Sequence, residues 1–507
     1  MHSLNVMLGQ EAQSYEYFQN VATIDGISDD YYQWYNMGAG STLKAPSSNY
    51  TGDKMLSYFA RINYSFKDRY LVTVTGRFDG SSKFGEDNRF AFFPSAALGW
   101  RASEEDFLKG NKVISNLKPR VSYGFTGNSG IPTYGSMANL STSGMAYPFG
   151  GTRENGIGVG SLANPLLRWE KTGQFNVGLD LGFFNERISL SADYYIKHTT
   201  DMLLNAPVPT TSGFRSISTN IGNMRNSGFE FTLNTQNIQT KNFSWSSMLN
   251  FSSLKNKITA LSQGDADIIM APNNLTILRV GESVGSFFGY IRDGVWGENE
   301  AEQAAIYGKL PGDAKLRDVN NDKQINESDR VILGKGIPDF YGTFTNTFKY
   351  KDFDLVIELQ YSCGSKIYWD GLGTCAMRQG IANSLSMVLD TWTPENQGAT
   401  LEQIRPSNAY YNSLKDDARL YNGSFIRGKN ISLGYNLPSD ICKKLHLKAL
   451  RVTLSAQNIF VISQYPGFDP ETTVYNTTTQ NEAFAQNIET FGYPKPRTFS
   501  FGANITF

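Results

Sequence analysis

Apolar and polar residues alternate with a period of two along most of this chain. In the segment 174–183 every odd position is apolar and every even position is polar or glycine. After a turn at Asn185-Glu186, the even positions of 188–196 carry the apolar side chains. This is the period of a β-strand with one apolar face. The pattern predicts about fourteen strands, near residues 3–12, 54–66, 69–80, 88–101, 117–126, 168–183, 187–199, 224–238, 242–256, 339–350, 353–366, 424–437, 448–459 and 497–507.

The connections between these strands alternate between short and long. Short turns, such as those at 66–68, 184–186 and 350–352, separate long segments near 13–53, 127–167, 200–223, 257–338 and 367–423. Short periplasmic turns and long extracellular loops are typical of an outer-membrane β-barrel. A soluble β-sandwich also alternates, but its solvent-facing positions usually carry more charges than the Ser, Thr, Asn, Gln and Gly found here. The sequence therefore predicts an all-β fold, a transmembrane antiparallel β-barrel.

The predicted barrel has a direction and a register. With the last strand running towards the periplasm, every short turn falls on the periplasmic side, provided that the strand-like stretch Gly285–Trp296 belongs to a long loop. The final strand is apolar on one face and ends on Phe507. The alternation predicts that one set of side chains faces lipid, namely Val177, Leu179, Leu190, Ala192, Phe499 and Phe501. It predicts that a second set faces the lumen, namely Asn176, Asp180, Ser189 and Asp193.

The strand count predicts a partial barrel. Transporters with a plugged lumen have about 22 strands, so roughly eight strands and the plug domain would be absent from these residues. The first residues, MHSLNVMLGQEAQ, have neither the basic nor the apolar region of a signal peptide. Because an outer-membrane protein must be exported, we expect the natural protein to begin upstream.

Composition agrees with a strand-built membrane protein. The 46 Lys and Arg and 47 Asp and Glu residues give a net charge of -1, which offers no electrostatic reason to expect nucleic acid binding. The chain has no run of 18 apolar residues, which excludes a helical membrane span but not a strand-built one.

The three cysteines are few for the length. Cys363 and Cys375 either form a bridge within one loop or are isolated residues.

Several longer segments resemble one known family. They are RFDGSSKFG (77–85) with FPSAALGWR (93–101), NPLLRWEKTGQFNVGLDLGFF (164–184) with RISLSADYY (187–195), NIGNMRNSGFEF (220–231), and LRVTLSAQNIF (450–460) with YPGFDPE (465–471). As an ordered set covering nearly the whole chain, they resemble the SusC/RagA family of TonB-linked outer-membrane proteins.

The resemblance implies a function and partners. It implies the bacterial outer membrane as the location, the TonB complex as the energy source, and import of oligosaccharides or peptides with a SusD-like surface lipoprotein. It also implies an amino-terminal plug and a TonB-contacting box, neither of which is visible in this sequence. Two alternatives remain open from the residues alone: a passive porin-like pore or surface binding scaffold, and a secreted carbohydrate-active enzyme.

One local motif, DVNNDKQINESD at 318–329, has the spacing of a calcium loop. Side-chain oxygens stand at loop positions 1, 3, 5 and 12, with a backbone carbonyl at position 7, and Ca²⁺ prefers such hard oxygen ligands. Lys323 replaces the usual turn glycine, and the final residue is aspartate rather than glutamate. The motif predicts a Ca²⁺ site in an extracellular loop, and the alternative is a metal-free polar turn. The predicted ligands are Asp318, Asn320, Asp322, Asp329 and the Gln324 carbonyl.

Other chemistry is weakly indicated. Aromatic residues in the long loops are candidates for stacking on sugars or peptide side chains, with loop packing or an interfacial belt as the alternative. They are Tyr31, Tyr32, Trp34, Tyr35, Tyr134, Tyr147, Trp369, Trp392, Tyr410 and Tyr411. The three histidines are far apart in sequence, and no Ser or Cys lies in a recognisable nucleophile motif. The sequence therefore predicts no enzyme.

Overall fold

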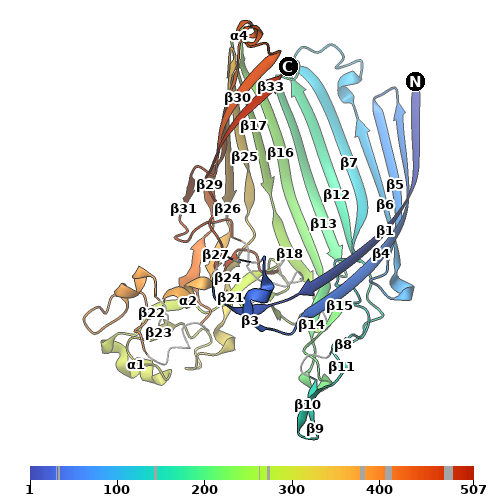
Figure 1. Ribbon diagram of the computed structural model, residues 1–507. Helices are drawn as coiled ribbons and strands as arrows, with labels where there is room; N and C mark the ends of the chain where they lie inside the picture. Colours follow the sequence, from blue (N-terminus) through green and yellow to red (C-terminus); the bar gives the residue numbers. More distant parts are fainter. Residues whose placement is uncertain are drawn as a thin grey trace.

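The fold is one large curved sheet with long loops gathered at one end (Figure 1). The computed structural model describes residues 1–29, 31, 33, 35–141, 145–261, 263–270, 274–376, 383–405, 414–472 and 484–507. Within these ranges no helix is long and apolar enough to cross a membrane.

The sheet consists of antiparallel strands whose order in space follows their order in the chain. The main strands are β1 (His2–Val21), β4 (Ser47–Phe66), β5 (Tyr70–Ser81), β6 (Phe90–Trp100), β7 (Ile114–Asn128), β12 (Glu170–Phe183), β13 (Ile188–Thr200), β16 (Asn223–Gln239), β17 (Phe243–Ser253), β25 (Phe340–Tyr350), β26 (Phe353–Cys363), β29 (Phe425–Asn436), β30 (Ala449–Gln457) and β33 (Thr498–Thr506). Each predicted strand corresponds to one of these. Two short strands, β18 (Lys255–Ala260) and β31 (Val461–Ser463), extend the sheet beside β16 and β29.

Short and long connections lie at opposite ends of the sheet, as predicted. Both chain termini and the helix α4 (Ser439–Lys444) lie at the short-turn end, and the long loops lie at the other end (Figure 1). The stretch 285–296 is outside the wall, where β21 (Ser286–Gly289) and β22 (Arg292–Val295) pair with other loop strands. A further long connection, 458–497, joins β30 to β33.

The first predicted loop, 13–53, is wrong in its bounds. β1 and β4 stay paired residue by residue from His2 opposite Phe66 to Val21 opposite Ser47. The loop is therefore 22–46, and it holds the small hairpin of β2 (Ile24–Ile27) and β3 (Gly40–Leu43). The outer half of β1, residues 13–21, lacks the regular apolar alternation by which the other strands were predicted, since Tyr17 and Phe18 are adjacent.

The sheet has one apolar and one polar face. Leu179 lies opposite Ala192 and Leu181 opposite Leu190, while Asp180 lies opposite Ser191 on the other face. The apolar row continues through the cross-strand pairs to the last strand, where Phe499 lies opposite Ala456 and Phe501 opposite Leu454. The two sets of side chains predicted to face lipid and lumen are thus separated onto the two faces.

Aromatic pairs border the apolar face at both ends. Near the short turns the rings of Phe353 and Tyr435 stack at 4.3 Å between centroids. Towards the loops Phe78 and Phe90 stack at 5.1 Å. From Tyr70, at the short-turn end of β5, to Phe78 is a span of about 26 Å at about 3.3 Å per residue. With the strand tilt of about 40° that is typical of outer-membrane barrels, this length spans about 20 Å along the membrane normal, which fits within their apolar band of about 25 Å.

Ion pairs hold the polar face together. Arg120 on β7 reaches across two strands, bonding to Asp180 on β12 and to Asp193 on β13 at 2.7 Å. Arg451 on β30 similarly bonds to Asp354 on β26, two strands away. Because each guanidinium bonds to a carboxylate two strands away, these charges fix the register from the polar side.

Candidate functional site

Three long loops pack together into one body over the loop end of the sheet. Its apolar core combines Leu275 and Phe287 from residues 254–339, Tyr368 from 364–424, and Ala485 and Ile488 from 458–497. We call these three segments the loop lobe. Within it, β27 (Lys366–Trp369) pairs with β28 (Leu420–Asn422) and, in parallel, with β32 (Ile488–Glu489).

Buried charges add to this core. Arg292 bonds to Asp416 and, at 3.0 Å, to Glu402. Lys415 bonds to Asp370, also at 3.0 Å. Both pairs are almost fully shielded from solvent, and the first joins the loop 254–339 to the loop 364–424. Since a buried charge without its partner is strongly unfavourable, these pairs specify how the loops fit together.

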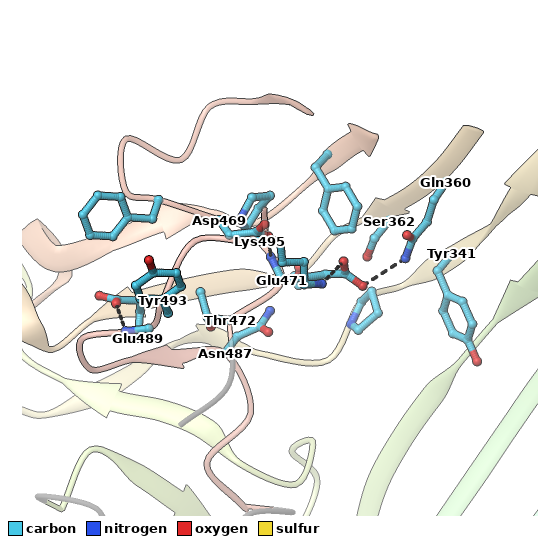
Figure 2. A pocket seen from close by; sticks show the side chains of 16 residues that line it. Tyr341, Gln360, Ser362, Asp469, Glu471, Thr472, Asn487, Glu489, Tyr493 and Lys495 are labelled. Carbon is cyan, nitrogen blue, oxygen red and sulfur yellow. Dashed lines mark hydrogen bonds and ion pairs between the residues drawn. The ribbon is translucent and has the colours of Figure 1, made fainter. Parts of the chain in front are cut away.

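A cleft of about 410 Å³ lies between the loop lobe and the polar face of the wall. Figure 2 shows its residues converging from the wall strands β25, β26 and β29 on one side and from loop residues on the other. The lining residues are Pro338, Tyr341, Gln360, Ser362, Ser365, Phe425, Phe468, Asp469, Pro470, Glu471, Thr472, Asn487, Glu489, Gly492, Tyr493 and Lys495.

One arginine anchors the loop side of this cleft to the wall. Arg427 on β29 is 1 % exposed and bonds to Asp469 at 2.6 Å and Glu471 at 3.3 Å. Glu471 also accepts hydrogen bonds from Gln360 on β26 and from Lys495, which precedes β33 (Figure 2). Burial alone would raise the pKa of the Glu471 carboxyl, but Lys495, Gln360 and Arg427 outweigh it and lower that pKa.

A second carboxyl at the cleft has no cation of its own. Glu489 is 4 % exposed; one of its oxygens accepts the Gly492 N–H at 2.7 Å, and the other has no partner among the described residues. Burial raises the pKa of Glu489, the Gly492 N–H opposes that effect, and the nearby charge of Asp370 adds to it. This carboxyl therefore holds a proton more readily than an exposed glutamate.

A family comparison agrees with this architecture. The family described as TonB dependent receptor-like, beta-barrel matches residues 3–459. The chain belongs to the TonB-dependent receptor β-barrel family. It is an outer-membrane protein, and the prediction of no enzymatic role is confirmed by relatives that are receptors and transporters.

Individual relatives of this chain include proteins of the SusC/RagA type. TonB-dependent receptor P3 of Formosa agariphila is 36 % identical over all of this chain and 51 % of its own length. TonB-dependent receptor SusC of Bacteroides thetaiotaomicron is 33 % identical over 92 % of this chain and 45 % of its own. The structure of the RagAB peptide transporter matches this chain with a TM-score of 0.82 and 27 % identity. The match covers all of this chain and 53 % of the transporter chain. The chain thus spans about half the length of the curated relatives it matches.

The predicted metal loop folds around its own side chains. Residues 318–329 lie between β23 (Ala314–Leu316) and β24 (Val331–Lys335). Asp318 accepts the backbone N–H groups of Asp322 and Lys323. Asp329 is fully buried and accepts those of Val319 and Asn326.

The backbone of this loop has the turn that its motif requires, but its acidic side chains are not grouped around a common point. Lys323, at the glycine position of the motif, has φ 64°. Asp322 accepts the Gln324 N–H, and Asn320 donates to Asp322. In the described ranges no three His, Cys, Asp or Glu side chains are grouped to hold a metal ion. The Ca²⁺ site therefore stays a prediction.

The predicted aromatic residues have mixed positions. Trp392 is buried, and Trp369 packs edge-on against Tyr421 and Tyr465 in the loop lobe. Of the others, four exposed rings lie on two loops outside the loop lobe: Tyr31 and Tyr35 between β1 and β4, and Tyr134 and Tyr147 between β7 and β12. Tyr32, Trp34, Tyr410 and Tyr411 lie outside the described residues.

The cleft itself was missed by sequence reasoning, although one of its segments carried part of the family resemblance. The segment YPGFDPE supplies Phe468, Asp469 and Glu471, but it served only as a family signature. Nothing in the sequence indicated that it meets Arg427. The considered bridge between Cys363 and Cys375 is absent, since both thiols are free.

Proposed function

We propose that this chain forms the carboxyl-terminal part of the wall of a TonB-dependent importer. The observation that supports this proposal is the two-faced sheet, with an apolar band outside and ion-paired polar residues inside, whose longest loops pack into a lobe over one end. A passive pore would not need such a lobe, because diffusion through it requires a water-filled lumen that stays open.

The proposed substrates are oligosaccharides or peptides, taken up with a SusD-like surface lipoprotein. The solved RagAB structure, to which this chain is similar, is that of a peptide transporter and supplies the peptide class. The oligosaccharide class and the SusD-like lipoprotein are what the resemblance to the SusC/RagA family implies, and SusC is among the relatives of this chain. The polar cleft beside the lumen is the candidate contact surface within this part of the protein.

Uptake in cells tests the proposal. The full-length protein should import a labelled oligosaccharide or peptide in a strain with functional TonB. It should import neither in a strain that lacks TonB. It should also copurify with a lipoprotein of the SusD type from native membranes. Uptake that is equal in the two strains, together with steady conductance in planar bilayers, would instead identify a passive pore.

A further inference from the structure

One connection at the short-turn end contains a helix. The segment 437–448 joins β29 to β30 and includes α4, whereas the turns 67–69, 184–187 and 351–352 are two to four residues long. Figure 1 shows α4 beyond the ends of the strands at this end of the sheet. In the barrel layout this end faces the periplasm. The segment therefore lies beside the periplasmic leaflet, which consists of phospholipid.

The apolar face of the wall leads directly into this segment. Tyr435 lies opposite Val452 in the apolar row and stacks on Phe353 in the aromatic border. Just beyond that pair, the Leu437 N–H bonds to the Leu450 carbonyl at 2.9 Å. From Tyr435 to the start of α4 is about 13 Å of extended chain. Because aromatic borders lie where hydrocarbon meets headgroups, α4 lies at the depth of the headgroups.

The helix presents apolar side chains at this depth. Ile441 and Leu445 are 44 % and 52 % exposed, and their spacing of four residues places them on the same side of the turn. The Leu445 N–H bonds to the Ile441 carbonyl at 3.1 Å, which fixes that spacing. On the other side Cys442 is buried and its thiol donates to the Leu437 carbonyl, which holds the helix to the strand end. Exposed apolar residues on a helix beside a membrane favour its insertion into the interface.

The same segment has an excess of positive charge. Residues 439–448 contain three lysines, Lys443, Lys444 and Lys448, and one acid, Asp440. All three lysines are exposed, and none forms an ion pair within the part of the chain that the structure describes. The other long connection at this end, 101–113, has three basic and three acidic residues. The positive charge is therefore particular to 437–448.

We propose that the segment 437–448 binds the headgroup of an anionic phospholipid of the periplasmic leaflet. The ammonium groups of Lys443 and Lys444 donate to phosphate oxygens, and Ile441 and Leu445 lie against the acyl chains. Free phosphate has no apolar part for these two residues, and a protein partner would not continue the lipid-facing surface of the wall. The site is separate from the loop lobe and goes beyond the proposed import function.

Native mass spectrometry of the full-length protein in a mild detergent measures the binding. Phosphatidylglycerol and phosphatidylcholine with the same acyl chains are titrated separately, because only the first has a net negative headgroup. Each lysine beside an anionic surface favours binding about fivefold, so phosphatidylglycerol should bind about tenfold or more tightly. The double variant Lys443→Gln and Lys444→Gln should lose most of that preference. An equal concentration of inorganic phosphate should not displace the lipid.

Hydrogen exchange in lipid nanodiscs locates the binding. Addition of phosphatidylglycerol to phosphatidylcholine nanodiscs should slow exchange of the amides of 439–448 in the unaltered protein, but not in the double variant.

The matched control is the double variant Lys109→Gln and Lys112→Gln, which removes two exposed lysines from the charge-balanced connection 101–113. It should keep the preference for phosphatidylglycerol and the slowed exchange. The inference is overturned if the two lipids bind equally, if both double variants lose the preference alike, or if phosphate alone displaces the lipid. It is also overturned if an acidic protein, rather than lipid, copurifies through Lys443 and Lys444.

Discussion

Leu190 and Ser189 are neighbours on β13 whose side chains lie on opposite faces of the sheet. Leu190 lies between Leu181 and Leu233 in the apolar row, and Ser189 lies beside Gly182 and Asn234 on the polar face. Leu190→Arg should destabilise the inserted barrel by about 2–4 kcal/mol, because the charge enters hydrocarbon, and Ser189→Arg should cost much less. Folding of the full-length protein into lipid vesicles, followed against urea concentration, measures both. Equal tolerance of the two substitutions would show that the assigned faces are wrong.

The buried Glu489 carboxyl should make the loop lobe sensitive to pH. Because its folded-state pKa is raised above its unfolded value, the folded lobe binds the proton more tightly. Its stability is therefore greater at low pH and falls as pH rises through the unfolded pKa towards the folded one. Glu489→Gln keeps an oxygen for the Gly492 N–H and removes the charge, so the lobe should gain stability at neutral pH and little in acid.

Hydrogen exchange of the β32 amides in the full-length protein, corrected for the intrinsic effect of pH, measures this gain. The exposed Glu86, on the turn between β5 and β6, gives the control Glu86→Gln, which should change nothing in the lobe. Faster β32 exchange in Glu489→Gln at neutral pH would contradict the argument.

At the scale of elements, strands were predictable and loop packing was not. A wall strand has its own signature, because each apolar side chain must face lipid whatever the other strands do. The outer parts of β1 and β4, residues 13–21 and 47–53, escaped prediction because their apolar and polar residues do not alternate regularly. The cleft escaped it because Arg427 meets Asp469 and Glu471 through a loop whose path no local pattern defines.

The loop 318–329 is an element whose prediction can be tested directly, and we propose that it binds Ca²⁺ in preference to Mg²⁺. Ca²⁺ accepts a flexible shell of side-chain and carbonyl oxygens, whereas Mg²⁺ resists losing its waters. Ca²⁺ should raise the melting temperature of the full-length protein more than Mg²⁺ does, and Asp318→Ala should abolish the difference. Lys323→Gly should strengthen binding, because a residue with a side chain is strained at φ 64°.

The control for this loop is Asp106→Ala, which removes an exposed acid at the short-turn end. It should leave the Ca²⁺ response intact. If Asp318→Ala and Asp106→Ala respond alike, or if Ca²⁺ has no effect on the unaltered protein, the loop is a polar turn held by its own backbone hydrogen bonds.

For the whole molecule, the consequence of the topology is an open sheet. The strand order runs from β1 to β33, and these two are the edges, each hydrogen-bonded on one side within the described residues. In hydrocarbon an unpaired edge leaves backbone N–H and C=O groups without partners, each at a cost of several kcal/mol. This accords with a chain that spans about half the length of its relatives, in which further strands would separate the two edges.

A polypeptide of these 507 residues produced by itself should therefore not fold into a closed, monomeric barrel. Closing the sheet by pairing β1 with β33 would force fourteen strands into a narrower cylinder, and the buried loop lobe and its ion pairs oppose that change of curvature. Refolded in detergent, the polypeptide should aggregate or pair through its edges, and should lack the heat-modifiable gel mobility of a complete barrel. Full-length SusC, treated identically, provides the positive control. A monodisperse, heat-modifiable monomer of the 507 residues would show that the two edges can satisfy each other after all.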